Sequence, residues 1–410
     1  MSEPLGTDAT ILVVGASLAG LRAAEETRHE GHAGPVVIVG DEVHPPYDRP
    51  PLSKQFLSGA WDEARIHHHA PDKLDSLGLE FRLGRRAVSL DTGARLVTCD
   101  DGGQLHYDGL IVATGARARA LPGTEDMAGV HTLRTLDDSL AVRTELEAAG
   151  PGARLVVIGA GFIGAEVAAT CHGTGARVTV VEALPTPLGR VLGDQMGEAC
   201  AQLHRNQGVT LLTGVGVDRI SSHQGADPPL VVHLVDGTHL DADVVVVGIG
   251  VVPDVEWLDG SGLTLDDGVV CTETLTAAPT VTAAGDIARW TLPSGEQVRL
   301  EHWTNAAESG ALAARNLLAG SQAARPYDPV PFFWSDQYAT KIQMIGLPGP
   351  DDEVVVVEGS VDEGKLVALY RRDDRLRAVL AFSRPRHLMA YRPLLAAGAS
   401  FDEAMALSVG

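Results

Sequence analysis

Short apolar runs rich in β-branched residues recur along the chain, and alanine-rich or polar segments separate them. The first run spans residues 10–14, an expected helix extends to about His29, and a second run spans 36–39. The same order returns at 155–158 and 178–181. Apolar runs of this length are typical of parallel strands buried on both faces. The pattern therefore predicts two copies of a strand–helix–strand unit.

Both copies continue in the same way. An Asp-Gly dipeptide, which is a hairpin signal, stands at 101–102 and again at 236–237. A buried strand that ends in glycine follows in each copy, within 107–115 and 240–250. We therefore expect each copy to be a parallel sheet with a small antiparallel insert, and the second copy to cover roughly residues 117–249.

The chain after residue 250 does not repeat the strand–helix–strand pattern a third time. Strand-like segments at 268–271 and 281–284 and a helix at about 304–318 are expected to complete the first domain, so the second is an insertion. Prolines between 326 and 331 predict a linker. Beyond it, apolar and polar residues alternate, which predicts an antiparallel sheet with one solvated face, capped by a helix from about Arg386.

The predicted fold class is α/β, with two Rossmann-like dinucleotide-binding domains, the second inserted in the first, plus a C-terminal α+β domain. The expected boundaries follow from the repeat and the linker. They are 1–116 together with 250–325 for the first domain, 117–249 for the second, and 326–410 for the C-terminal domain.

The second copy carries the clearest chemistry. Gly159, Gly161 and Gly164 form a G-x-G-x-x-G motif with Phe162 and Ile163 between them, after a strand and at the start of a helix. The first glycine allows the turn, the second lets the backbone approach a pyrophosphate, and the third lets helix and strand pack closely. The helix N-terminus then binds the phosphates.

A carboxylate closes this motif. Glu182 follows the second strand, where a ribose hydroxyl can donate to it. The first copy repeats the arrangement with Gly15 and Gly20, but Ser17 replaces the middle glycine. Two such motifs predict that the protein binds two nucleotides.

Composition narrows the function classes. The net charge of -22 over 410 residues disfavours nucleic acid or an anionic membrane as a partner, because phosphate contacts need basic surface. No apolar run approaches the roughly 20 residues that cross a bilayer. The N-terminal segment shows no export signal, so we expect a cytoplasmic protein. Four scattered cysteines and the His67-His68-His69 triplet are interpreted as structural thiols and a solvated loop, without a metal site.

The chain resembles the FAD-dependent NAD(P)H:ferredoxin reductases that serve bacterial monooxygenases and ring-hydroxylating dioxygenases, the family of putidaredoxin reductase. The resemblance covers essentially the whole chain. Its most specific motifs are residues 47–54 (Y-D-R-P-P-L-S-K), 113–115 (A-T-G), 284–286 (A-G-D) and 333–338 (F-W-S-D-Q-Y).

The resemblance implies that the first copy binds FAD, with Asp41 or Glu42 on the adenosine ribose and Asp286 on the ribityl chain. It places Lys54, one of only four lysines, near the flavin nitrogen that accepts hydride. The remaining implied flavin-contacting positions are Gly15, Ser17, Ala19, Gly20, Arg49, Val88, Ala113, Thr114, Gly115, Arg134, Gly285 and Trp303.

The second copy is then expected to bind the nicotinamide nucleotide, with Gly250 at its end. Glu182 favours NADH, since a carboxylate would repel the 2′-phosphate of NADPH, although Arg190 is near enough in sequence to complicate this. By resemblance, Glu166 lies beneath the nicotinamide and pairs with Lys54. A solvated helix acid is the alternative. Trp334 is placed between the C-terminal domain and the flavin edge, with a core tryptophan as the alternative.

The resemblance thus implies hydride transfer from NADH to FAD and single-electron transfer to a small acidic 2Fe-2S ferredoxin that supplies an oxygenase. The reductase is expected as a monomer or weak homodimer. The candidate docking cations are Arg315, Lys341, Arg371, Arg372, Arg375 and Arg377. A rubredoxin reductase shares nearly all these motifs and stays open, as does a non-enzymatic flavoprotein like apoptosis-inducing factor. A flavin disulfide reductase is disfavoured, because residues 45–57 contain no cysteine.

Overall fold

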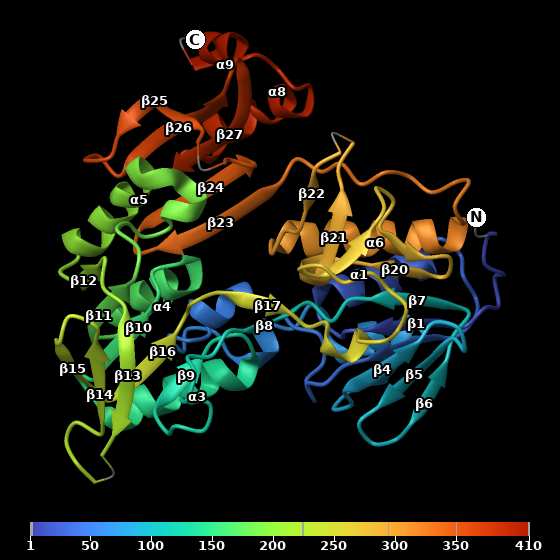
Figure 1. Ribbon diagram of the computed structural model, residues 1–410, viewed down its shortest axis with the longest axis horizontal. Coiled ribbons are helices and arrows are strands. Elements are labelled where there is room, and N and C mark those ends of the chain that lie inside the picture. The colour runs from blue at the N-terminus through green and yellow to red at the C-terminus, as the bar shows by residue number, and fades with distance from the viewer. Residues whose placement is uncertain (1–2, 224, 294, 350, 409–410) are drawn as a thin grey trace. The chain divides into compact units, whose positions relative to one another are not determined.

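The computed structural model describes residues 3–223, 225–293, 295–349 and 351–408 (Figure 1). The chain forms two compact units, each built from three separate segments. Unit 1 contains Met1–Asp48, His67–Arg117 and Val252–Pro329, and unit 2 contains Arg49–Ile66, Ala118–Val251 and Val330–Gly410. The short strands β8 (Ala116–Ala118) and β17 (Val251–Pro253) contain two of the points where the chain passes from one unit to the other.

Unit 1 is built on a six-stranded sheet, parallel except for β19 at one edge. The predicted strands 10–14 and 36–39 form its centre as Ile11–Val14 and Val36–Val39, all eight residues buried. In sheet order the strands are β19 (Thr276–Ala278), β20 (Val281–Ala283), β7 (Gly109–Val112), β1 (Ile11–Val14), β2 (Val36–Val39) and β3 (Glu80–Arg82). Strand order reverses beside β1, where nucleotides bind in such sheets.

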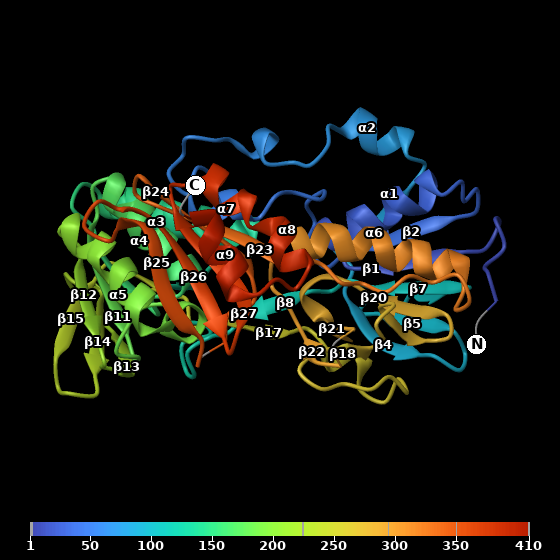
Figure 2. The same cartoon turned by 90° about the horizontal axis from the view of Figure 1, so that it is seen from above.

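Two long helices, α1 (Leu18–His29) and α6 (Trp303–Ala319), lie side by side in unit 1 (Figures 1 and 2). Gly310 permits this contact, because a Cβ there would stand 2.3 Å from the Ala19 carbonyl oxygen. Unit 1 also contains α2 (Pro71–Ser76), the antiparallel insert β4 (Ala87–Asp91), β5 (Leu96–Cys99) and β6 (Gln104–His106), and a sheet of β18 (Val269–Cys271), β21 (Ala288–Thr291) and β22 (Gln297–Val298).

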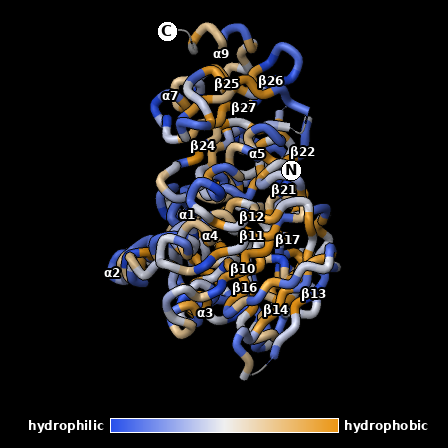
Figure 3. Tube along the Cα trace, turned by 90° about the vertical axis from the view of Figure 1, so that its left-hand side faces the viewer, coloured by the Kyte–Doolittle hydropathy of each residue, from blue (hydrophilic) through white to orange (hydrophobic). Residues whose placement is uncertain are grey.

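Unit 2 repeats the same plan with a five-stranded parallel sheet. In sheet order its strands are β12 (Thr210–Thr213), β11 (Arg177–Glu182), β10 (Arg154–Ile158), β16 (Val244–Val247) and β9 (Val130–Thr132). The hydrophobic colour of β10, β11 and β16 in Figure 3 marks the buried centre. Unit 2 also contains the helices α3 (Leu136–Ala149), α4 (Phe162–Gly173) and α5 (Gly189–Asn206). Its antiparallel insert consists of β13 (Val217–Ser222), β14 (Leu230–Leu234) and β15 (His239–Ala242).

The C-terminal part of unit 2 is an antiparallel sheet in which both faces are covered. Its strand order is β23 (Phe332–Gln337), β24 (Thr340–Gly346), β27 (Arg375–Phe382), β26 (Lys365–Arg372) and β25 (Glu353–Ser360). One face packs on α5 through residues such as Met196, and the other packs on α7 (Pro385–Ala390), α8 (Arg392–Ala396) and α9 (Phe401–Ser408). The expectation of one solvated face is therefore wrong, because the apolar face of α5 needs the sheet to cover it.

The segment 49–66 belongs to unit 2 although it lies between two segments of unit 1. It contains two 3-10 helices, η1 (Pro50–Ser53) and η2 (Glu63–Arg65). Hydrogen bonds from side chains of α3 and α4 hold its backbone: Ser139 donates to the Leu52 carbonyl at 2.7 Å and Thr170 to the Ser53 carbonyl at 2.8 Å. The segment is thereby attached to α3 and α4, two helices of unit 2.

The histidine triplet is not the solvated loop that was expected. All three histidines are partly buried within unit 1, and His69 contacts Glu25 of α1 through its Nε2 atom. Burial also lowers the pKa of His68. In the part of the chain that the structure describes, no helix combines the length and the apolar character needed to cross a membrane.

One buried histidine makes the stability of unit 2 dependent on pH. His204 on α5 is fully buried, its Nδ1 lies 2.7 Å from the Tyr338 hydroxyl, and burial lowers its pKa to about 4. Protonation therefore favours the unfolded chain, whose histidine has a pKa of about 6.5. The stability from the neutral imidazole is complete above pH 6.5 and decreases as the pH falls from 6.5 toward 4.

We expect this histidine to cost about 2 kcal/mol of unfolding free energy between pH 7.5 and pH 5. Urea unfolding of the wild type and of His204→Gln at both pH values measures it, because glutamine keeps a polar partner for Tyr338 but does not titrate. The variant should lose less stability on acidification. Equal losses in the two proteins would exclude His204 as a source of acid sensitivity.

Candidate functional site

The first glycine motif, residues 15–20, has the backbone geometry that a close phosphate contact requires. Gly15 has a φ of +119°, and a Cβ there would lie 2.0 Å from the Ala113 carbonyl oxygen. A Cβ on Gly20 would lie 1.9 Å from the Gly15 carbonyl oxygen. Both positions therefore exclude every residue except glycine. Ser17, at the N-cap of α1, has an extended backbone that a non-glycine residue adopts readily, which explains why the middle glycine can be replaced.

The register of the strands shows how the two motifs differ at the ribose position. The backbone N–H of Gly15 donates to the Val39 carbonyl, and that of Gly159 donates to the Val181 carbonyl. The next residue is Gly40 in the first copy and Glu182 in the second. A carboxylate cannot stand at Gly40, because even a Cβ would lie 2.5 Å from the Ala16 Cβ.

The acids of the first copy follow one and two residues after Gly40. Asp41 is exposed, and its carboxylate accepts the Glu42 backbone N–H at 3.0 Å. Glu42 is half-buried and accepts a hydrogen bond from the Tyr47 hydroxyl. The Asp41 carboxylate is thus the more exposed to solvent, and the Glu42 carboxylate is held by the Tyr47 hydroxyl. Contact with the ribose stays a prediction for both residues.

Two further turns of unit 1 lie at the same end of its sheet. Ala113, Thr114 and Gly115 follow β7, and Gly285 and Asp286 follow β20. Gly115 and Gly285 both have positive φ, at +68° and +74°. The Thr114 hydroxyl donates to the Asp254 carbonyl at 3.0 Å, and the Gly285 N–H donates to Ser309 at 2.9 Å. The carboxyl end of β1, β7 and β20 is therefore lined by turns held in place by hydrogen bonds.

The structure places three further implied flavin contacts, Ala19, Val88 and Trp303, in unit 1. Ala19 packs against both Gly285 and Gly310, so it contributes to the contact between α1 and α6. Val88 is 46% exposed on β4. The Trp303 indole N–H donates to the Asp48 carboxylate at 2.6 Å. These positions stay predictions as cofactor contacts.

The second glycine motif, residues 159–164, is the more regular of the two. Gly159 has a φ of +98°, and a Cβ on Gly164 would lie 2.0 Å from the Gly159 carbonyl oxygen. At Gly161, which caps α4, a Cβ would meet no atom closer than the Gly248 carbonyl at 3.9 Å. The backbone at Gly161 is therefore uncrowded at the start of the helix, which fits the close approach of a pyrophosphate.

Glu182 lies beside this motif. Its two carboxylate oxygens accept the backbone N–H groups of Ala160 and Leu184, at 2.7 and 2.8 Å. Each oxygen has a second acceptor site, so ribose hydroxyls could still donate to it. Arg190 is exposed near the start of α5, and Gly250 follows β16 with a φ of +99°. Phe162 and the 45% exposed Ile163 form the first turn of α4.

A buried charge pair of unit 2 joins the segment 49–66 to α4. Lys54 Nζ and the Ser53 hydroxyl both donate to Glu166 Oε2 at 2.5 Å. Glu166 Oε1 accepts the Ser335 hydroxyl at 2.8 Å and the Asp336 backbone N–H at 3.3 Å. The side chains of Lys54 and Glu166 are only 11% and 3% exposed. The interpretation of Glu166 as a solvated helix acid is therefore wrong, while its pairing with Lys54 is present in the structure.

The remaining candidate residues of unit 2 are Arg49, Arg134 and Trp334. Arg49 donates to the Arg134 carbonyl at 2.6 Å, and the Arg134 N–H donates to Asp138 at 2.8 Å. Trp334 is partly buried on β23, where its ring stacks on Phe332 with centroids 6.0 Å apart. A fully buried core position is therefore not the role of Trp334.

Sequence reasoning missed the hydroxyl donors to Glu166. Ser53 lies in the motif 47–54 and Ser335 in the motif 333–338, but no role was predicted for either serine. A signal was available for Ser335, because β23 alternates and places Phe333, Ser335 and Gln337 on its buried face. A buried serine needs a hydrogen-bond partner, which points to a polar group on the element opposite.

The four cysteine side chains are buried thiols. Cys99, Cys171, Cys200 and Cys271 are all buried and unpaired with one another. Burial raises the pKa of Cys171, Cys200 and Cys271 to about 12, so they remain protonated thiols. Reactive cysteines instead need a lowered pKa and access to solvent.

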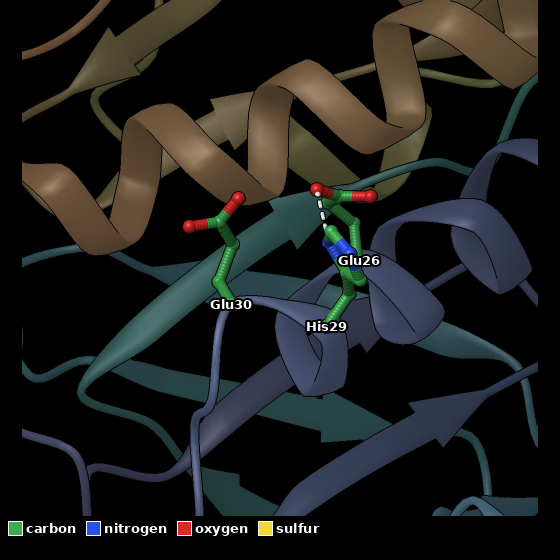
Figure 4. A group of neighbouring side chains, drawn as sticks. All are labelled: Glu26, His29 and Glu30. Atoms are coloured by element: carbon green, nitrogen blue, oxygen red, sulfur yellow. Dashed lines mark hydrogen bonds and ion pairs between the residues drawn. The ribbon is translucent and has the colours of Figure 1, made fainter.

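A cluster of acids at the end of α1 is an ion-pair network. Glu26, His29 and Glu30 bring their side chains together, with His29 Nδ1 at 3.3 Å from Glu26 (Figure 4). Arg315 of α6 places its Nε atom 2.5 Å from Glu26 and 2.9 Å from Glu30. The guanidinium therefore already supplies the positive charge that these carboxylates require.

The candidate docking cations are also largely paired. Arg371 contacts Glu353 at 2.6 Å, Arg372 contacts Asp352 at 2.7 Å, and Lys341 lies 3.6 Å from Asp336. Arg375 donates to the Gly398 carbonyl at 2.5 Å, and Arg377 is partly buried on β27. Acids next to these cations reduce the local positive potential that the basic residues alone suggested.

Comparisons with known proteins agree with this arrangement. The profile of the family described as pyridine nucleotide-disulphide oxidoreductase matches residues 9–310, and that of a reductase C-terminal domain matches 332–408.

Rhodocoxin reductase of Rhodococcus erythropolis is 38% identical to this chain, over 94% of this chain and 89% of its own. The biphenyl dioxygenase system ferredoxin–NAD(+) reductase component of Paraburkholderia xenovorans is 37% identical, over 98% and 96%. The solved covalent putidaredoxin reductase–putidaredoxin complex matches with a TM-score of 0.90 at 32% identity, over 96% of this chain and 94% of that one. The predicted fold class is confirmed.

Two glycines of α4 provide a test of the second motif. In Gly164→Ala the new Cβ forces the Gly159 carbonyl to move, and a shift of about 1 Å in a binding site can cost up to about 100-fold. We therefore expect NAD+ to bind about 10- to 100-fold more weakly, as measured by calorimetric titration. Gly173→Ala is the matched control on the same helix, since its Cβ meets no atom within 4 Å. Equal affinity in the two variants would show that nucleotides do not bind over this motif.

Proposed function

We propose that this chain, which belongs to the pyridine nucleotide-disulphide oxidoreductase family, is an FAD-dependent ferredoxin reductase that takes its electrons from NADH. The observation that carries the proposal is the combination of two glycine motifs fitted for nucleotides with the buried Lys54–Glu166 pair. The four buried, unpaired cysteines favour an electron acceptor other than a disulfide.

The residues of the first motif would hold FAD and those of the second would hold NADH. Bound FAD would supply the redox chemistry that connects a two-electron donor to a one-electron acceptor. The backbone N–H groups at the start of α1 and α4 would bind the two pyrophosphates. Lys54 would place a positive charge near the flavin, and Glu166 would hold its amine in position.

NADH is the proposed donor because of Glu182. Its carboxylate is fixed by two backbone N–H groups, so it cannot swing away from a 2′-phosphate without losing both hydrogen bonds. Arg190, the basic residue that could instead favour NADPH, is exposed eight positions further along the chain. The fixed negative charge therefore supports NADH.

The proposed acceptor is a small 2Fe-2S ferredoxin. This class is supported by the relatives whose names describe ferredoxin reductases of dioxygenase systems, and by the match to the reductase of the putidaredoxin complex. A rubredoxin is the second candidate. We further propose that the reductase acts in the cytoplasm as a monomer or weak homodimer, and that docking uses a small local set of cations, since most of the candidates already pair with acids.

Steady-state reduction of purified 2Fe-2S ferredoxins and rubredoxins, with NADH and NADPH side by side, tests the function. The proposal expects NADH-dependent reduction of at least one 2Fe-2S ferredoxin and a kcat/KM for NADH well above that for NADPH. Turnover with dyes but with no iron–sulfur protein would contradict the ferredoxin assignment. Preference for a rubredoxin would select the second candidate.

Replacing Glu182 by glutamine removes the charge and keeps the shape of the side chain, but its amide nitrogen can no longer accept one of the two backbone N–H groups. We expect kcat/KM for NADH to fall roughly tenfold, because hydrogen bonds to a charged group contribute about 1.5–3 kcal/mol. We expect kcat/KM for NADPH to rise, since the repulsion of the 2′-phosphate is removed. An unchanged ratio of the two values would show that Glu182 does not determine the choice of nucleotide.

A further inference from the structure

The Glu166 carboxylate has a binding partner outside the two nucleotide-binding motifs. Its Oε2 atom faces Ser53 and Lys54, and its Oε1 atom faces β23, the first strand of the C-terminal sheet. There the Ser335 hydroxyl donates at 2.8 Å and the Asp336 backbone N–H at 3.3 Å. Ser335 is fully buried, so no water competes for its hydroxyl.

The direction of the Ser335 hydroxyl is itself determined by a neighbour. Gln337, also fully buried on the same face of β23, places its Nε2 atom 3.4 Å from Ser335 Oγ. A hydroxyl has one proton to donate, and an amide that donates to its lone pair leaves that proton for another acceptor. Among the described residues, the acceptor is Glu166 Oε1.

The packing around this network fixes β23 against α4. The Phe333 and Phe162 rings lie 4.6 Å apart at one end of the contact. At the other end the Tyr338 ring contacts His172 with centroids 6.3 Å apart. Glu166 lies between these contacts along α4. The strand is therefore held on both sides of Ser335, and the distance from the hydroxyl to the carboxylate follows from packing rather than from a mobile side chain.

We propose that Ser335 is a positioning residue for the reductase. It holds Oε1 of Glu166, so that the carboxylate cannot rotate and Oε2 remains directed at Lys54. Gln337 directs the Ser335 hydroxyl. The C-terminal sheet thereby contributes to the orientation of the Lys54 amine, a role that the proposed function leaves to Lys54 and Glu166 alone and on which this inference rests.

The test is a double-mutant cycle of Ser335→Ala and Glu166→Gln in the FAD-loaded protein. In Ser335→Ala we expect the limiting rate of flavin reduction by NADH to fall roughly tenfold, the equivalent of one hydrogen bond to a charged group, with the affinity for NAD+ unchanged. In the Glu166→Gln background the same substitution should have no further effect on the rate. Ser335→Thr, which keeps the hydroxyl, should recover most of it.

A second readout does not depend on activity. The unfolding equilibrium constants of the four proteins should be non-additive by about tenfold, because the two groups share a hydrogen bond. Ser261→Ala is the matched control: Ser261 is also a buried serine, but its hydroxyl accepts only the Leu263 backbone N–H in the described contacts.

Three results would contradict the inference. They are a wild-type rate in Ser335→Ala, an equal fall in rate with and without Glu166, and additive unfolding constants. A wild-type flavin that NADH does not reduce would instead contradict the proposed function, and the unfolding cycle would still decide the role of Ser335.

Discussion

A buried carboxylate must be surrounded by donors, and Glu166 imposes this constraint on unit 2. An unpaired charge at a position that is 3% exposed would cost several kcal/mol. The chain satisfies it with donors from two segments far apart in sequence, Ser53 and Lys54 on one side and Ser335 and Asp336 on the other. These hydrogen bonds join the segment 49–66 and β23 to the same helix, α4.

The two glycine motifs, 15–20 and 159–164, share one backbone geometry and differ in the acid at the end of the second strand. Each copy places a positive-φ glycine after a buried strand and excludes a Cβ where helix and strand meet. They diverge at the residue after Val39 and Val181, where Gly40 leaves no space for a side chain and Glu182 extends a carboxylate to the motif. The acids of the first copy, Asp41 and Glu42, therefore follow one and two residues later.

Sequence patterns predicted the elements well where local physics decides them. Buried strands such as 36–39 and helices such as α6 lie within one or two residues of their expected limits. The patterns failed where distant segments meet. Alternation in the C-terminal strands could not reveal that α5 covers one face of the sheet, and no local pattern shows that Ser335 lies opposite Glu166. The positive potential around the docking cations was likewise overestimated, because their acidic partners come from other strands and loops and are not visible in the local sequence.

The packing of unit 2 should depend on Lys54 and Glu166 acting as a charged pair. Urea unfolding of Lys54→Met, Glu166→Gln and the double variant measures this dependence. We expect Lys54→Met alone to cost about 3–5 kcal/mol of unfolding free energy, because it leaves the buried carboxylate without its cation, and the double variant to cost much less than the sum of the single variants. Costs that add within about 0.5 kcal/mol would show that the two residues do not act as a pair.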